Sequence, residues 1–153
     1  MSKLKVFISG DTGNKSLTKN EMDCIKQIIE NGHTILIGDS FGLERKIQKL
    51  LIQLDCHSVT VYFSGKNVRN NLGNWQTKQI VNTENLTGKT RYRLKDKTMI
   101  DDCDSAMLFW DDKSDGLETI IKQLNELKKY YLILSRTGLD FGFLNKINNM
   151  IIL

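Results

Sequence analysis

The stretch Gly38-Asp39-Ser40-Phe41-Gly42 follows an apolar run and holds a carboxylate between two glycines. Glycines let the backbone approach a ligand closely, and a carboxylate accepts hydrogen bonds from sugar hydroxyls or base amines. Asp39 or Ser40 could equally cap a following helix. The pattern therefore leaves Asp39 with two roles, a sugar contact or a helix cap.

A second polar stretch, SGDTGN, follows the first apolar run and contains Ser9, Gly10, Asp11 and Thr12. Its hydroxyls and backbone amides are suited to contact a phosphate. The stretch lacks the Gly-Lys-Ser/Thr of a phosphate-binding Walker loop and does not match the dinucleotide GxGxxG. A turn without any ligand is the alternative.

A third stretch, SGKNVRNNLGNW, offers Arg69, Asn70 and Trp75. An arginine can bind a phosphate or carboxylate through two hydrogen bonds, and a tryptophan offers a face on which a base can stack. We expect these residues to clamp a ligand. The alternative is a surface loop anchored by a buried tryptophan.

The fourth stretch, WDDKSDGLET, begins at Trp110 and places Ser114 and Gly116 at the start of a helix. This arrangement predicts an anion cradle or an ordinary N-cap. Lys95 and Asp96 precede the same apolar run and share a helical face, so they are expected to point toward the strand ends or to lie on a solvated face. All four stretches thus supply ligand-binding candidates.

Five apolar runs predict the strands that must position these stretches: 4–9, 33–38, 58–63, 105–110 and 130–135. Helical periodicity is expected over 17–32, 41–54 and 116–129, and a basic helix is expected to start near residue 91. Alternating apolar strands and helices are typical of a parallel sheet covered on both faces. We therefore predict an α/β, Rossmann-like three-layer sandwich of about five strands, with ligands at the carboxyl ends of the strands.

Two segments depart from this alternation. Residues 64–89 are too long for an ordinary loop and are expected to carry function or a short extra helix. Residues 136–153 follow the fifth strand and end in MIIL, so we expect them to dock on the body or to form a contact between subunits of a homo-oligomer. The whole chain, 1–153, is predicted to form one domain.

Composition narrows the function classes. The 153 residues carry a net charge of +4, with lysines and arginines spread along the chain, so we expect an anionic small ligand and consider a nucleic-acid partner unlikely. The three cysteines lack metal-ligand spacing, so no metal and no cofactor are expected. With neither a leader nor a run of about 20 apolar residues, the sequence predicts a cytoplasmic protein without a membrane partner.

Four motifs together carry a resemblance: KVFISG, ILIGDSFGLE, VTVYFSG and KDKTMIDDCDSAMLFWDDKSDG. In this order they resemble the SLOG superfamily, named for the DNA-processing Smf/DprA proteins and the lonely-guy (LOG) phosphoribohydrolases, over about residues 4 to 135. The resemblance implies a nucleotide pocket formed by the turns after the first, second and fourth strands. Its implied binding residues are Ser9, Gly10, Gly38, Asp39, Gly42, Ser114 and Gly116.

The chain departs from the lonely-guy signature, Arg-Lys-x-x-Met followed by PGGxGTxxE. Lys95 stands where the family has its arginine and Asp96 where it has its lysine, while Leu117 and Thr119 replace the threonine and the glutamate. Glu118 is one residue out of phase, turned about 100° around the helix. The resemblance therefore implies a related pocket without lonely-guy catalysis.

From these patterns we expect a protein that senses or sequesters a nucleotide or nucleotide-derived small molecule. The resemblance implies a ligand of the ADP-ribose or cyclic-nucleotide type that antiviral relatives use. The alternative is an N-glycosidic-bond hydrolase or ribosyltransferase, with Asp39, Asp96 or Asp111 as its carboxylate. A third possibility is a subunit-contact domain with an empty pocket. The DNA-processing relatives bind single-stranded DNA, but the sequence shows no dense basic groove with interleaved aromatics.

Overall fold

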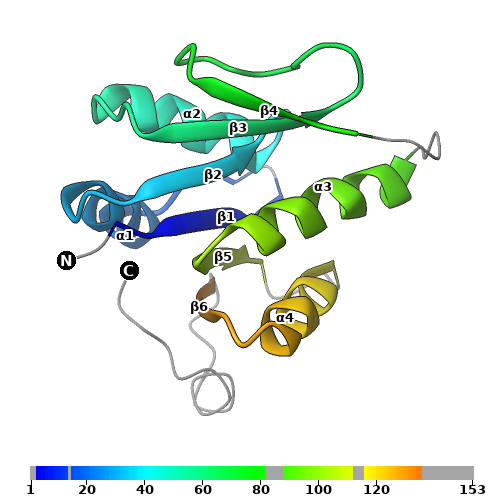
Figure 1. Ribbon diagram of the computed structural model, residues 1–153. Coiled ribbons are helices and arrows are strands. Elements are labelled where there is room, and N and C mark those ends of the chain that lie inside the picture. The colour runs from blue at the N-terminus through cyan, green and yellow to red at the C-terminus, as the bar shows by residue number, and fades with distance from the viewer. Residues whose placement is uncertain (1–2, 14, 82–87, 112–115, 136–153) are drawn as a thin grey trace.

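The computed structural model of the chain describes residues 3–13, 15–81, 88–111 and 116–135, leaving out the side chain of residue 89. It forms one parallel sheet of six strands in the order β4-β3-β2-β1-β5-β6, with helices packed against both faces (Figure 1). The predicted Rossmann-like α/β fold is therefore confirmed. The strands are β1 (Lys5–Asp11), β2 (Thr34–Gly38), β3 (Val59–Ser64), β4 (Gln76–Ile80), β5 (Ser105–Trp110) and β6 (Tyr130–Ser135).

All five predicted strands are present, because central parallel strands are buried on both faces and keep long apolar runs. β1 lies between β2 and β5, with Val6 opposite Ile35 on one side and Ser105 on the other. Val6 and Ile35 are fully buried. The polar turns follow the carboxyl ends of these buried strands, which fix their positions.

The sixth strand, β4, was not predicted. It lies within the stretch 64–89, where a functional loop or a short helix was expected, and it pairs in parallel with β3 from Gln76 opposite Thr60 to Ile80 opposite Ser64. Only Ile80 of its five residues is buried. An edge strand with four exposed polar positions shows neither an apolar run nor alternation, so hydrophobic patterning missed it.

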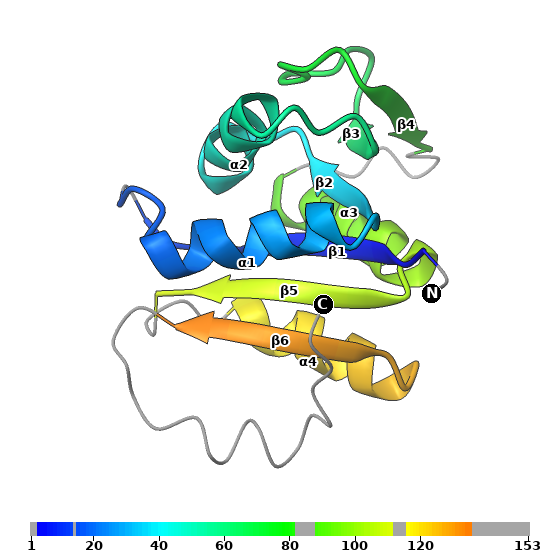
Figure 2. The same cartoon turned by 90° about the vertical axis from the view of Figure 1, so that its left-hand side faces the viewer.

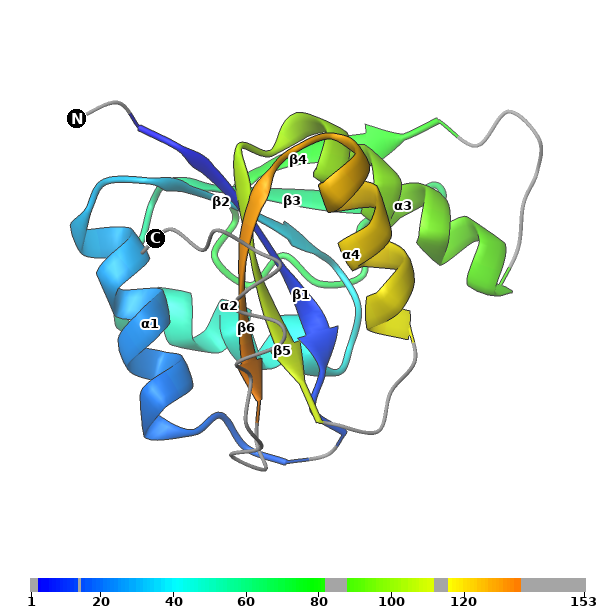
Figure 3. The same cartoon turned by 90° about the horizontal axis from the view of Figure 1, so that it is seen from below.

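The four helices form the two outer layers. α1 (Lys19–Glu30) and α2 (Leu43–Gln53) pack on one face of the sheet, while α3 (Gly88–Asp102) and α4 (Gly116–Glu126) cover the other. Figures 2 and 3 show the two pairs on opposite sides of the strands. The helical stretches expected from the sequence are thus confirmed.

The order of the strands creates a crevice at the carboxyl ends of the central strands. From β1 the chain adds β2, β3 and β4 on one side, and then crosses to place β5 on the other side of β1. The carboxyl ends of β1 and β5 are therefore the point where the direction of the winding reverses, which is where open α/β sheets bind ligands.

Two other expectations can be set against the described residues. No helix among them is long and apolar enough to cross a membrane. The tail 136–153, with its predicted docking or oligomer contact, lies outside the part of the chain that the structure describes.

Candidate functional site

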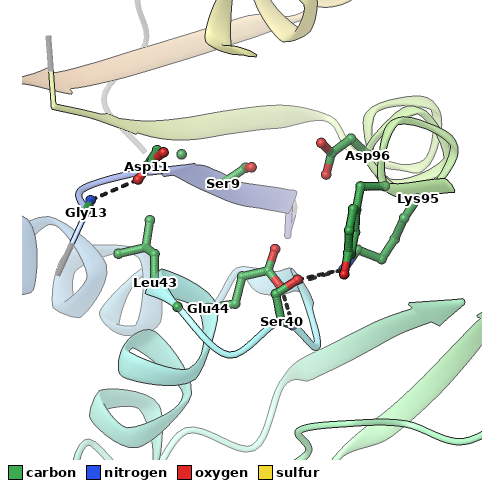
Figure 4. A pocket seen from close by; sticks show the side chains of 11 residues that line it. Ser9, Asp11, Gly13, Ser40, Leu43, Glu44, Lys95 and Asp96 are labelled. Atoms are coloured by element: carbon green, nitrogen blue, oxygen red, sulfur yellow. Dashed lines mark hydrogen bonds and ion pairs between the residues drawn. The ribbon is translucent and has the colours of Figure 1, made fainter. Parts of the chain in front are cut away.

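A cleft of two adjoining cavities opens at the carboxyl ends of β1, β2 and β5. The α2 lobe, about 290 Å³, is shown in Figure 4. The α4 lobe, about 150 Å³, shares with it a wall made by Ser9, Gly10, Asp11 and Asp96. The α2 lobe is further lined by Gly13, Ser40, Gly42, Leu43, Glu44, Tyr92 and Lys95. The α4 lobe is further lined by Phe109, Trp110, Gly116, Leu117 and Ile120.

Asp39 lies behind the α2 lobe and is fully buried. Its carboxylate accepts hydrogen bonds from the backbone N–H of Arg69 at 2.9 Å, from Arg69 Nη2 at 3.1 Å and from Lys95 Nζ at 3.3 Å. Burial alone would raise the pKa of Asp39, but the hydrogen bonds from Arg69 and the charge of Lys95 outweigh it and lower the pKa. Asp39 therefore holds two cations in place and presents no carboxylate oxygen to a ligand.

Asp39 does not cap α2 either. Gly42 is the N-cap residue and makes no side-chain hydrogen bond, while the Glu44 carboxylate accepts a hydrogen bond from the backbone N–H of Ser40 at 2.7 Å. A Cβ on Gly38 would overlap this Glu44 carboxylate. Gly38 thus gives room to a side chain of the protein, and Gly42, with open space around it, borders the cleft.

Tyr92 forms an exposed aromatic surface backed by two cations. Lys95 Nζ lies 5.4 Å and Arg69 Cζ 5.3 Å from the centroid of its ring, and Arg69 Nη1 donates a hydrogen bond to its hydroxyl at 2.9 Å. The Lys95 side chain is only 2% exposed, whereas Tyr92 is 39% exposed. Cations against an aromatic ring fix its orientation, so Tyr92 is held as a platform at the cleft.

Ser9 and Asp96 are the polar groups of the shared wall that remain available. Neither side chain makes a hydrogen bond to any described part of the chain, although Ser9 is only 8% exposed. Burial, and secondly the charge of Glu44, raise the pKa of Asp96 to about 7 against the opposing charge of Lys95. Near neutral pH this carboxyl group is therefore divided between its protonated and ionised forms.

Asn70 anchors the segment between β3 and β4. Its side chain donates to the carbonyl of Asp39 at 2.9 Å and accepts from Arg45 at 2.7 Å. The fully buried Gln48 donates to the carbonyl of Asn70 at 3.0 Å and to that of Gly38 at 3.2 Å. Gln48 was not predicted from the sequence as part of the site. The feature that could have identified it is its place beside Ile47, as a polar residue on the apolar face of a helix.

Trp75 lies away from the cleft. It is buried in the core beside the start of β4, and its indole N–H donates to the carbonyl of Cys56 at 2.9 Å. Cys56 precedes β3, so this contact lies at the amino ends of the strands. The structure therefore separates Trp75 from Arg69, with which it was expected to form a clamp.

The remaining candidates divide between the cleft and its surroundings. Gly10 lines both lobes, yet its φ of +140° and its close approach to the Phe109 backbone give it a structural reason to be glycine. The buried hydroxyl of Thr12 has no hydrogen-bond partner among the described residues, and Thr12 does not line the cleft. Asp111 is half-buried outside both lobes, and Ser114 lies outside the described residues.

Basic side chains from two separate parts of the sequence lie near the carboxyl end of β3, outside the lining of the cleft. Lys66 and Arg69 follow β3, and Arg91 and Arg93 lie in the first turns of α3, at the same edge of the sheet. Arg91 donates to the hydroxyl of Ser64 at 2.9 Å, which ties α3 to the end of β3. Lys66, Arg91 and Arg93, together with Arg69, are called the basic rim below.

Phe41, in the turn after β2, is 64% exposed at this edge. Neither Phe41 nor Tyr92 was among the residues predicted from the sequence. The feature that could have identified them is an aromatic residue at a position outside the apolar face of any helix or strand. Among the described residues, no group of three or more His, Cys, Asp or Glu side chains is placed to hold a metal ion.

Comparisons with known proteins agree on the fold. No family model and no curated protein sequence matches the chain. The DNA processing protein A of Helicobacter pylori, which binds single-stranded DNA, superposes with a TM-score of 0.62 at 11% identity, over 93% of this chain and 71% of that one. The DNA processing protein A (DprA) of Streptococcus pneumoniae gives a TM-score of 0.63 at 10% identity, over 95% of this chain and 58% of that one.

These likenesses correct two expectations. From the sequence, a sensor of small nucleotide-derived molecules was expected, and nucleic acid was considered an unlikely partner. Both expectations are wrong, because the two solved structures described above are DNA processing proteins, one of which binds single-stranded DNA. At 10 to 11% identity, these likenesses show a shared fold.

Proposed function

We propose that this chain is a single-stranded-DNA-binding protein of the SLOG superfamily, and that the strand lies across the cleft and the basic rim. The observation that carries the proposal is Tyr92, an exposed ring held against Lys95 and Arg69 at the mouth of the cleft. Proteins that bind single strands without reading a sequence combine such stacking platforms with a positively charged surface. The likeness to a protein that binds single-stranded DNA supports this proposal.

The basic rim supplies the contacts to phosphate. Lys66 and Arg93 are exposed, and Arg69 is 26% exposed at its side chain. Their charges lie at one edge of the sheet, so a strand following this edge can neutralise several phosphates in succession. Lys95, which is buried and paired with Asp39, contributes its charge through Tyr92 and not by direct contact.

The aromatic side chains supply the contacts to bases. Stacking of a base on an aromatic side chain contributes about 1–3 kcal/mol, with little preference among bases. Tyr92 and Phe41 are both exposed for this purpose. Asp11, Glu44 and Asp96 line the cleft with carboxyl groups, which repel phosphates. The strand is therefore expected to direct its phosphates to the rim and its bases toward the cleft.

Fluorescence anisotropy with labelled single-stranded and duplex oligonucleotides tests the proposal. The chain should bind the single strand more tightly than the duplex, and Tyr92→Ala should weaken binding by about 5- to 150-fold, the equivalent of one lost stacking contact. Tyr130→Ala is the matched control, since Tyr130 is 44% exposed at the start of β6, at the opposite edge of the sheet. Equal losses in the two variants, or no binding by the wild type, would contradict the proposal.

A further inference from the structure

The α4 lobe has the shape and lining of a site for one nucleobase. Leu117 and Ile120 form an apolar wall on α4, and the half-buried Trp110 packs against them. The side chain of Phe109 is fully buried in the core on the α1 and α2 face, so it adds no apolar wall to this lobe. The boundary with the α2 lobe is polar. A base has two apolar faces and a hydrogen-bonding edge, so it fits a cavity that is apolar around one polar side. The volume of about 150 Å³ is that of a pocket for a fragment of a ligand, not for a long segment of a strand.

The polar side of this lobe has unused hydrogen-bonding groups. Ser9 and Asp96 make no side-chain hydrogen bond to any residue that the structure describes, and both also face the α2 lobe, where Tyr92 lies. Ser9 is buried and Asp96 half-buried, and both line the cleft, so a ligand that enters the α4 lobe can form hydrogen bonds with them.

We infer that the α4 lobe accepts one unstacked base of the bound strand, with the hydrogen-bonding edge of that base against Asp96 and Ser9. The inference rests on the proposed function and deepens it, because it assigns to the cleft a contact that reads a base. Asp96 is then the residue that determines which bases are accepted.

The protonation of Asp96 decides the chemistry of this contact. A protonated carboxyl group offers one donor and one acceptor, which matches a neighbouring acceptor and donor on the pairing edge of any base. The ionised carboxylate offers acceptors only, and guanine alone presents two adjacent donors, its N1–H and its amino group, on that edge. The protonated form should therefore tolerate all bases, while the ionised form should retain guanine.

The charged groups around Asp96 act on its protonation in opposite directions. Glu44 faces it from α2 and Asp11 from β1, while Lys95 beside it on α3 opposes them and is itself paired with Asp39. With a pKa of about 7, the protonated fraction falls from about nine-tenths at pH 6 to about one-tenth at pH 8. If only the protonated form binds a strand without guanine, the affinity for that strand falls about tenfold from pH 6 to pH 8.

The test is the affinity of a labelled oligo-dT strand and of an alternating dG-dT strand at pH 6 and pH 8, in lithium buffers of equal ionic strength. For the wild type we expect about a tenfold loss with oligo-dT and less than a threefold loss with the dG-dT strand. The side chain of Asp96→Asn is neutral at both pH values, so the affinity of this variant for either strand should change by less than about twofold between them. His57→Gln, which removes an exposed imidazole at the opposite edge of the sheet, should keep the wild-type losses.

Each result bears on a different claim. Equal losses with the two strands in the wild type, or a tenfold loss that persists in Asp96→Asn, would overturn the base contact while leaving DNA binding in place. No binding of either strand at either pH would instead overturn the proposed function. The comparison of the two strands uses the wild-type chain alone, so it stands even if a variant fails to fold.

Discussion

Removal of the Asp39 carboxylate should strongly destabilise the protein. Asp39→Ala leaves the Lys95 ammonium, 2% exposed, without the buried partner at 3.3 Å, and deprives Arg69 of the acceptor for its backbone and side-chain N–H groups. Loss of one member of a buried ion pair costs about 3–5 kcal/mol, because the remaining charge stays desolvated. Glu44 lies 3.7 Å from Lys95 and offsets part of this cost, so we expect the lower half of that range.

Urea unfolding at pH 7, followed by far-UV circular dichroism, measures this loss as a change in the free energy of unfolding. Lys95→Met in the Asp39→Ala background removes the uncompensated charge and should restore more than about 1 kcal/mol. Glu30→Ala, which breaks an exposed pair with Lys26 at 3.9 Å, is the control and should change stability by less than about 0.5 kcal/mol.

Two results would refute the reasoning on Asp39. The first is a loss below about 1 kcal/mol for Asp39→Ala, the cost of an ordinary surface ion pair. The second is strict additivity of the Asp39 and Lys95 substitutions, which would mean that the two side chains do not depend on each other. Either result would remove the explanation for the position of the Tyr92 platform.

Three further predictions concern the wall and the rim of the cleft. The pKa of Asp96 is about 7 when folded and 3.8 ordinarily, so the folded state binds more protons between these values and the wild type loses stability as pH rises from 4 to 7. From pH 4 to pH 8, the free energy of unfolding of Asp96→Asn in urea should therefore rise relative to that of the wild type by up to about 4 kcal/mol. A difference between the two proteins that does not change with pH would contradict this prediction. Gly10→Ala should cost more than about 2 kcal/mol, measured as a fall in Tm, because a Cβ there meets the Phe109 backbone and φ is +140°; an unchanged Tm would be the opposing result. Arg93→Ala and Lys66→Ala should each reduce the slope of log affinity for single-stranded DNA against log salt by about 0.7, and an unchanged slope would place that residue off the path of the strand.

The core strands could be predicted because burial on both faces leaves a signal in the sequence itself. β2 and β5 are apolar nearly throughout, and their boundaries differ from the predicted ones by at most one residue. β4 gave no such signal, since Gln76 through Gln79 are exposed and the strand exists only through its hydrogen bonds to β3. Edge strands are stabilised by tertiary pairing, which local sequence patterns do not record.

The site was predictable in position but not in chemistry. The polar turns after β1 and β2 were found because ligand sites of this fold lie at strand ends. The role of Asp39 depends on Arg69, 30 residues away, and on Lys95, 56 residues away, and such a network is visible only when the chain is folded. Arg69 and a basic helix start near residue 91 were found in the sequence, but their convergence with Lys66 was not, because these residues are dispersed along the chain and meet only in the fold.

The most direct test of the central claim is the affinity of the wild type and of Tyr92→Ala for a labelled single-stranded oligonucleotide at pH 6 and low salt. We predict saturable binding by the wild type, a loss of about 5- to 150-fold in Tyr92→Ala, and no comparable loss in Tyr130→Ala. Wild-type protein that leaves the anisotropy of the strand unchanged, or a Tyr92→Ala variant that binds as tightly as the wild type, would contradict the account.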